Sequence, residues 1–244
     1  MAKKTFKDKF QRIETKYVIS KETLADLLQE FEAYMAEDEH AYSTIGNLYY
    51  DTSTYQMIRE SLEKPYFKEK LRVRTYDAAP QADSQVFLEI KKKVRKVVYK
   101  RRIATELLIA EQYLAGECQL EDSQIKQEIE WLCERYGGVP PMMYIYYNRY
   151  SLKGLEDSNV RITIDYDVAY RTKNLSLLAG KDGKNLLPDN HVIMEIKVPG
   201  AYPLWLAEIL DRHHVFPKSF SKYGVAYKKT TDYKGVINHV RSAI

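Results

Sequence analysis

The chain has 244 residues, of which 45% are hydrophobic and 30% are charged, and this composition predicts a folded protein with a sizeable core. The formal net charge is only +4, which is too small to indicate nucleic-acid binding by itself. Two cysteines exclude a disulfide-rich scaffold or a cysteine-rich zinc site. Because neither a signal segment nor a membrane-spanning apolar run is present, we expect a soluble cytoplasmic protein.

The predicted elements begin with a strand over 11–20, where charged and apolar residues alternate with a period of two. Ser20 is a typical helix N-cap, and apolar residues at helical spacing predict a helix over about 21–35. A second strand is predicted over 43–51, and a short helix follows near 55–62. The chain therefore opens with strands and helices in alternation.

Three strands with alternating charge follow over 66–76, 85–93 and 97–104. The linker 77–84 contains Pro80 and is typical of a hairpin loop. On each strand one face carries Lys, Arg or Glu, and the other face is mainly apolar. We expect an antiparallel meander in which one face is charged.

Helical spacing over 106–136 predicts helices with a break at Gly116, and the glycine pair at 137–138 ends this region. Aromatic and β-branched residues then predict two strands, over 142–152 and 159–170. The strands and helices together indicate an α+β fold.

The last third of the chain begins with a surface loop, which we expect over 175–190. The clearest alternation in the sequence predicts a strand over 191–199. A helix over 203–213 and a terminal helix follow. Because no repeat or domain boundary interrupts the sequence, we expect a single domain over 1–244.

Nearly every predicted strand carries an Arg or a Lys two residues from another charge. For any single strand, a solvated sheet face is the simplest interpretation. Many strands with short connections, however, favour a closed barrel, because closure removes unpaired edges. Amphipathic helices would then cover the apolar faces on the outside, and the charged faces would line the interior. Arg and Lys side chains inside a barrel would repel one another unless an anion lay between them, so the pattern indicates a polyanionic ligand.

Seven short motifs in chain order resemble those of one protein family. They are RIETKY (12–17), KLRVRTY (70–76), VFLEIKKK (86–93), VYKRR (98–102), VRITID (160–165), MEIKV (194–198) and FSKYG (220–224). Together they are similar, over about 10–229, to the VTC-type polyphosphate polymerase domain of the triphosphate tunnel metalloenzyme, or CYTH-like, superfamily. The resemblance implies a single triphosphate tunnel domain, in which a closed antiparallel eight-stranded β-barrel has helices packed outside and a polyphosphate chain within.

The resemblance also implies which cations contact phosphate. The catalytic phosphate ligands would be Lys16, Arg72, Arg74, Lys91, Lys100, Arg161 and Lys222. Three further residues on these strands are predicted to bind substrate, namely Arg102, Arg149 and Lys197.

The acidic residues of the motifs are the predicted metal ligands. The resemblance assigns Mn²⁺ or Mg²⁺ to Glu195, with Glu14 and Glu89 as further candidates. Ion pairing with a neighbouring lysine is an equal alternative for Glu14 and Glu89. The wider superfamily opens with a Glu-x-Glu-x-Lys pattern, and Arg12 stands here in place of the first acid. This departure favours the polymerase branch over a two-metal hydrolase.

The activity implied by the resemblance is that of an ATP-dependent polyphosphate polymerase, which passes the γ-phosphoryl group of ATP to a growing polyphosphate chain. A tripolyphosphatase or nucleoside triphosphatase of the same fold is the first alternative. A non-catalytic binder of polyphosphate or RNA is the second, although nucleic acid is not the expected partner. Neither a Walker A pattern nor a dinucleotide-binding glycine fingerprint occurs in the sequence.

Overall fold

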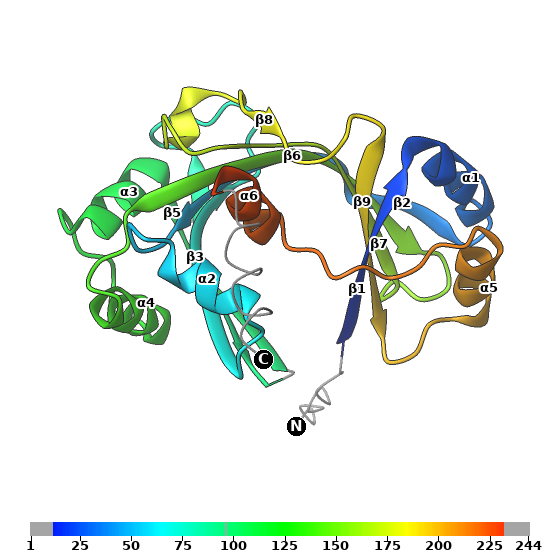
Figure 1. The fold of residues 1–244 in the computed structure, drawn as a ribbon, viewed down its shortest axis with the longest axis horizontal. Helices are drawn as coiled ribbons and strands as arrows, with labels where there is room; N and C mark the ends of the chain where they lie inside the picture. Colours follow the sequence, from blue (N-terminus) through cyan, green and yellow to red (C-terminus); the bar gives the residue numbers. More distant parts are fainter. Residues whose placement is uncertain (1–11, 96, 232–244) are drawn as a thin grey trace, which may run out of the picture. The chain divides into compact units, whose positions relative to one another are not determined.

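The structure is a computed structural model that describes residues 12–95 and 97–231. Its strands form one nine-stranded sheet, which is accompanied by α-helices and one short 3₁₀ helix at Leu177–Ala179 (Figure 1). The strands are β1 (Arg12–Ser20), β2 (Met35–Tyr50), β3 (Phe67–Thr75), β4 (Gln85–Val94), β5 (Val97–Glu106), β6 (Pro141–Gly154), β7 (Arg161–Arg171), β8 (Lys184–Asn185) and β9 (His191–Pro199). The helices are α1 (Lys21–Phe31), α2 (Gln56–Leu62), α3 (Leu107–Ala115), α4 (Gln124–Arg135), α5 (Leu204–Arg212) and α6 (Lys222–Thr230).

These elements confirm the predicted α+β class, and most element bounds agree with the sequence pattern to within a few residues. The main difference is β2, which begins at Met35 and not at 43, so that α1 ends earlier than predicted. Residues 36–39 are Ala, Glu, Asp and Glu, which are depleted in strands, so strand pairing here overrides local propensity. The predicted loop over 175–190 contains the 3₁₀ helix and β8. Position 11 and the residues after 231 lie outside the described residues.

The prediction of a closed eight-stranded barrel is wrong, because the sheet is open. Its strand order is β1-β9-β7-β6-β2-β3-β4-β5, with β8 beside β7. In the described part of the chain, β1 pairs only with β9 and β5 only with β4. Closure is not needed to protect β5, because its Lys100, Arg101 and Arg102 make it a charged edge that disfavours pairing with another strand.

The chain divides into two compact units, and each is described by itself. Within the described residues, the first unit comprises 12–43, 148–167 and 187–220, and the second comprises 44–147, 168–186 and 221–231. Strands β2, β6 and β7 contribute residues to both units. No helix in the described part of the chain combines the length and apolar character needed to span a membrane.

In the first unit, α1 and α5 pack on the apolar side of β1, β7 and β9, and the two helices lie beside each other (Figure 1). Ser20 begins α1 as predicted, since its Oγ accepts a hydrogen bond from Thr23 N at 3.1 Å. The buried side chains at the centre of this core include Leu27, Phe31, Ile162, Met194 and Leu206.

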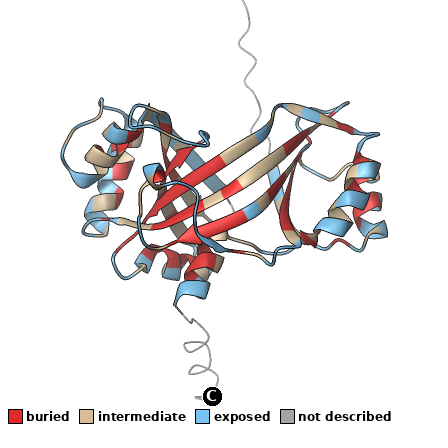
Figure 2. Cartoon of the chain, turned by 90° about the horizontal axis from the view of Figure 1, so that it is seen from above, coloured by how far each residue is buried: buried red, intermediate tan, exposed pale blue. Residues whose placement is uncertain are grey.

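In the second unit, α3 and α4 cover the apolar side of the meander β3-β4-β5. The buried side chains of this core include Leu71, Leu88, Leu107, Ile129 and Leu132. Figure 2 shows the buried residues concentrated along the strands and on the helix sides that face them. Because side chains alternate across a strand, this packing leaves Lys70, Arg72, Arg74, Glu89, Lys91, Lys100 and Arg102 on the opposite face of the sheet. Glu69, Lys92 and Arg101 lie on the helix side, where they pair with residues of α4.

Candidate functional site

The register of the second unit places three lysines side by side across neighbouring strands. Lys70 lies opposite Lys91, and Lys91 lies opposite Lys100. Like charges that face each other directly across strands destabilise a sheet. Lys70 Nζ donates a hydrogen bond to Ser221 Oγ at 3.0 Å, and Lys100 Nζ lies 2.8 Å from Glu89 Oε1. The row therefore favours the binding of an anion that reduces this repulsion.

A second row in the same register surrounds Glu89, of which 1% is exposed. Its Oε2 accepts hydrogen bonds from Arg72 Nε at 2.8 Å and Arg72 Nη2 at 2.6 Å, and Arg74 Nε lies 3.7 Å away. Lys100 Nζ lies 2.8 Å from Oε1, as an ion pair without hydrogen-bond geometry. Burial alone would raise the pKa of Glu89, but Arg72, Arg74 and Lys100 lower it to about 2.

These residues share one face of the sheet with Lys70, Lys91 and Arg102, and together with Lys222 of α6 we call them the Glu89 cluster. It consists of Lys70, Arg72, Arg74, Glu89, Lys91, Lys100, Arg102 and Lys222. Arg102 lies opposite Glu89 on β5, with its guanidinium carbon 4.3 Å from the centre of the Phe87 ring. The cluster thus holds one carboxylate among several cations.

Arg74 is held by a residue that the sequence did not single out. Its Nε donates to Asn47 Oδ1 at 2.9 Å, and its Nη1 donates to the Tyr76 hydroxyl at 3.3 Å. Asn47 is buried and in turn donates from Nδ2 to Ile145 O at 3.1 Å. Asn47 and Tyr49 are two residues apart on β2 and therefore share a strand face, and this spacing is the only sequence signal that could have identified Asn47.

Tyr49 is a further residue that sequence reasoning missed. Its hydroxyl accepts a hydrogen bond from Arg72 Nη1 at 3.0 Å, and its ring stacks on Tyr223 with 4.6 Å between centroids. Burial would raise the pKa of Tyr49, but Arg72, Lys70 and Arg74 together lower it to about 8. The phenol therefore lies among cations of the Glu89 cluster.

Helix α6 brings Lys222 to the same unit. Asp51 fixes this helix, because its buried carboxylate accepts a hydrogen bond from the Tyr223 hydroxyl at 2.8 Å and others from the first turn of α2. Gly224 permits close packing here, since a Cβ at that position would lie 3.0 Å from Leu62 Cδ2. Lys222 Nζ consequently lies 4.4 Å from the centre of the Tyr147 ring.

The first unit contains a separate charged group around Glu195, which is only 6% exposed. In register, Lys16 lies opposite Glu195 on β9, and Glu195 lies opposite Thr163 on β7. Glu195 contacts Lys197 Nζ at 2.5 Å and Lys16 Nζ at 3.4 Å. Burial would raise the pKa of Glu195, but Lys197 and Lys16 hold it well below its ordinary value, so the carboxylate is ionised at neutral pH.

Glu14 belongs to this group as well, since its carboxylate lies 3.6 Å from Lys16 Nζ. Two arginines of the unit are paired with aspartates. Arg149 donates to both oxygens of the buried Asp165, at 2.6 and 2.9 Å, so Asp165 orients this arginine. Arg161 pairs with Asp38 on β2. We call this group the Glu195 cluster, and it consists of Glu14, Lys16, Arg149, Arg161, Glu195 and Lys197.

The predicted site residues thus fall into two groups. Arg72, Arg74, Lys91, Lys100, Arg102, Lys222 and Glu89 lie in the second unit, and Lys16, Arg149, Arg161, Lys197, Glu14 and Glu195 lie in the first. A family model described as the VTC domain matches residues 11–231.

The chain belongs to the VTC domain family. This membership confirms the family to which the seven motifs pointed. No curated protein matches this VTC domain. A solved structure described as a candidate adenylate cyclase from Bacillus halodurans is 14% identical, with a TM-score of 0.53, and the match covers 86% of this chain and 93% of that chain. At this identity the similarity establishes a shared fold.

Two other solved structures also match the VTC domain. One is a candidate adenylate cyclase from Vibrio parahaemolyticus, with 12% identity and a TM-score of 0.48, covering 88% of this chain and 97% of that chain. The other is the triphosphatase of the Mimivirus capping enzyme, with 12% identity and a TM-score of 0.36, covering 82% of this chain and 88% of that chain.

Oxygen donors of the kind that a hard divalent cation prefers lie around Glu195 in this VTC domain. Thr163 Oγ1, opposite Glu195, is buried and has no hydrogen-bond partner among the described residues. Glu14 and Glu195 both lie within reach of Lys16 Nζ. In the described part of the chain, no three Asp, Glu, His or Cys side chains lie close enough together to hold a metal ion. Glu195, Glu14 and Thr163 would be the protein ligands of Mg²⁺ or Mn²⁺, which commonly bind one or two carboxylates and complete their shell with phosphate oxygens or water. A bound ion would take the place of Lys16 or Lys197 at Glu195.

Proposed function

We propose that this VTC domain is a metal-dependent polyphosphate polymerase that transfers the γ-phosphoryl group of ATP to the end of a polyphosphate chain. The observation that carries the proposal is the cationic face of the Glu89 cluster, in which Lys70, Lys91 and Lys100 lie directly opposite one another. An extended polyanion is the ligand that such a row neutralises, because its charges repeat along its length.

The arginines of the cluster supply fixed hydrogen-bond donors. A guanidinium has five N–H groups, and Arg72 uses Nε and one N–H of each terminal nitrogen for Glu89 and Tyr49. The remaining donors, whose directions are fixed by these contacts, would bind phosphate oxygens. Phosphoryl transfer has a loose transition state with charge on the equatorial oxygens, so donors oriented in advance stabilise it.

The Glu195 cluster would hold the metal, through Glu195 with Glu14 and Thr163. A bound Mg²⁺ or Mn²⁺ ion supplies positive charge that neutralises and orients phosphate oxygens. Lys16 and Lys197 keep the Glu195 carboxylate ionised and oriented, so no proton has to leave it when a cation binds.

The acceptor needs no general base, because the terminal phosphate of a polyphosphate chain is already anionic near neutral pH, with a second pKa of about 6 for a phosphate monoester. One of its oxygens would form a bond to the γ-phosphorus of ATP. The bond between that phosphorus and the β,γ-bridging oxygen breaks, and ADP leaves with the electron pair. The cations would then hold the lengthened chain.

The test is to incubate the purified protein with ATP and Mn²⁺ and to measure polyphosphate, ADP and free phosphate in the same sample, with a chelator-treated sample as control. Polyphosphate and ADP in equal phosphoryl amounts, absent with chelator, would support the proposal. Free phosphate without polymer would overturn it and indicate a triphosphatase of the same fold. Neither product would overturn it in favour of a binding protein.

A further inference from the structure

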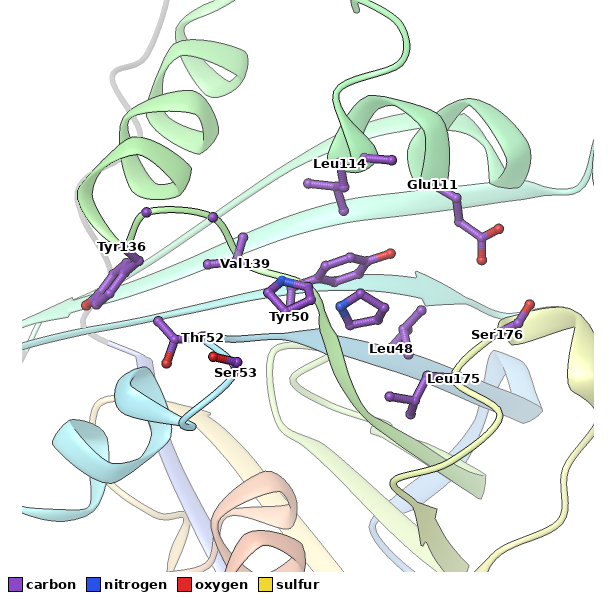
Figure 3. A pocket seen from close by; sticks show the side chains of 15 residues that line it. Leu48, Tyr50, Thr52, Ser53, Glu111, Leu114, Tyr136, Val139, Leu175 and Ser176 are labelled. Carbon is purple, nitrogen blue, oxygen red and sulfur yellow. The ribbon is translucent and has the colours of Figure 1, made fainter.

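A pocket of about 680 Å³ lies in the second unit (Figure 3). It is on the side of β2 that faces away from the Glu89 cluster. Leu48 and Tyr50 line it, whereas Asn47 and Tyr49, which alternate with them along β2, contact the arginines. Its remaining walls come from α3, from the turn at 136–141 and from residues 175–176. The volume lies in the range of small-molecule sites, about 300–1,000 Å³.

The lining combines apolar walls with a single formal charge. Glu111 is the only charged residue among the lining residues, which include no Lys and no Arg. The apolar walls are formed by Leu48, Leu114, Val139, Pro140, Pro141 and Leu175. Because the only charge is negative, a phosphate or another anion would be repelled, so the pocket differs in kind from the Glu89 cluster.

The Glu111 carboxylate is half-buried and has no hydrogen-bond or ion-pair partner among residues 12–95 and 97–231. Burial raises the pKa of Glu111, and no cation opposes this effect. Burial together with the Glu111 charge also raises the pKa of Tyr50. In Figure 3 the Tyr50 hydroxyl points to the part of the pocket that Glu111 enters from α3. A half-buried carboxylate without a cationic partner loses part of its hydration uncompensated, so it offers a position for a cationic group.

We propose that this pocket binds a small organic cation, whose ammonium group contacts Glu111 while its apolar body packs against the leucine and proline walls. The ring of Tyr50 adds an aromatic surface on which a cation is favourable. A metal ion does not suit the pocket, because Glu111 is its only carboxylate and a hard cation prefers several oxygen ligands. This inference goes beyond the proposed polymerase and does not depend on it.

The test compares benzylamine, which is an ammonium ion at pH 7, with benzyl alcohol, which has the same shape and no charge. Titration calorimetry on the full chain should show saturable binding of benzylamine, at least about tenfold tighter than that of the alcohol, as expected for one charge-assisted contact. Glu111→Gln should remove this preference and leave the alcohol unchanged. Glu117→Gln, on an exposed residue after α3, is the matched control and should behave like the parent.

A second variant keeps the test decisive. Ala115 lines the pocket from the exposed end of α3, so Ala115→Trp should fill the space and abolish binding of both compounds. The inference is overturned if benzylamine does not bind saturably, or if Glu111→Gln retains the preference for the cation. Tripolyphosphate affinity, measured in parallel, should be equal in Glu111→Gln and the parent, which separates this result from any failure of the polymerase proposal.

Discussion

Arg72 and Glu89 face each other in register on β3 and β4, and the guanidinium donates two hydrogen bonds to one carboxylate oxygen, at 2.8 and 2.6 Å. With Lys100 at the other oxygen and Arg74 nearby, three cations surround the Glu89 carboxylate, against the two lysines at Glu195. These contacts favour the ion-pair interpretation of Glu89 over metal ligation. Its function would be to orient the arginines and to reduce their mutual repulsion when no phosphate is bound.

Arg74→Ala should weaken tripolyphosphate binding by about tenfold or more. A charge-assisted hydrogen bond contributes about 1–3 kcal/mol, and about 1.4 kcal/mol corresponds to a factor of ten. Calorimetry of tripolyphosphate binding measures the effect. Arg95→Ala, on an exposed residue between β4 and β5, is the matched control and should bind like the parent. An Arg74→Ala protein that binds within twofold of the parent would contradict the assigned role.

Glu89→Gln keeps the side-chain shape but leaves Arg72, Arg74 and Lys100 without a counter-charge. We expect the free energy of unfolding to fall by about 3 kcal/mol, the lower end for removal of one partner of a buried ion pair, because Lys100 is partly exposed. Tripolyphosphate should raise the Tm of the variant more than that of the parent, because the anion replaces the lost charge. Thermal unfolding with and without tripolyphosphate measures both effects, and equal shifts in the two proteins would oppose the prediction.

The same carboxylate gives a pH dependence with a defined sign. The folded pKa of Glu89, about 2, lies below its ordinary value of 4.5, so its contribution to stability is present above pH 4.5 and is lost as the pH falls toward 2. Chemical unfolding between pH 2 and pH 6 should therefore show a loss of stability that is smaller in Glu89→Gln. An identical slope in parent and variant would assign the acid sensitivity to other groups.

Tyr49 should make phosphate binding weaker in mild alkali. Its pKa of about 8 means that raising the pH from 7 to 9 converts the phenol to a phenolate, which adds a negative charge beside Arg72. The affinity for tripolyphosphate should fall over this range with a midpoint near pH 8, and Tyr49→Phe should abolish the fall. Tyr99→Phe, on an exposed residue of β5, provides the control. Retention of the same pH profile in Tyr49→Phe would exclude this residue as the cause.

Glu195→Gln separates metal binding from phosphate binding. If Glu195 holds the metal, turnover should collapse, while metal-free binding of tripolyphosphate should persist or tighten because a negative charge has been removed. If Glu195 only pairs with Lys197, turnover should keep its normal metal dependence. Activity and calorimetry on the same protein distinguish the two cases, with Glu208→Gln on the exposed face of α5 as control. Normal turnover in Glu195→Gln would mean that Glu195 is not the metal ligand, and Glu14 would be the next candidate.

The sequence by itself determined which residues share a strand face. Charges alternate with apolar residues along 66–76, 85–93 and 191–199, and the pleat of a strand turns that period of two into one charged and one apolar side. Helical spacing of apolar residues likewise determined the helices that cover the apolar sides. Both patterns are local, so the α+β class and the charged face of the meander could be predicted without tertiary information.

Only the tertiary structure decided which charges meet. The pairing of Lys70 with Lys91 and Lys100 depends on the register of two consecutive hairpins, which the alternation along each strand does not specify. The pairing of Lys16 with Glu195 depends on register between strands at opposite ends of the chain. The same holds for the open sheet, because hydrogen bonds between distant strands determine which strands lie at its edges. Arg161 shares the alternation of Arg72, yet pairing with β9 places it beside Lys197 in the other unit. An alternation with a period of two specifies the strand face on which a side chain lies. Which strand pairs beside it is decided by the packing of the other strands and helices.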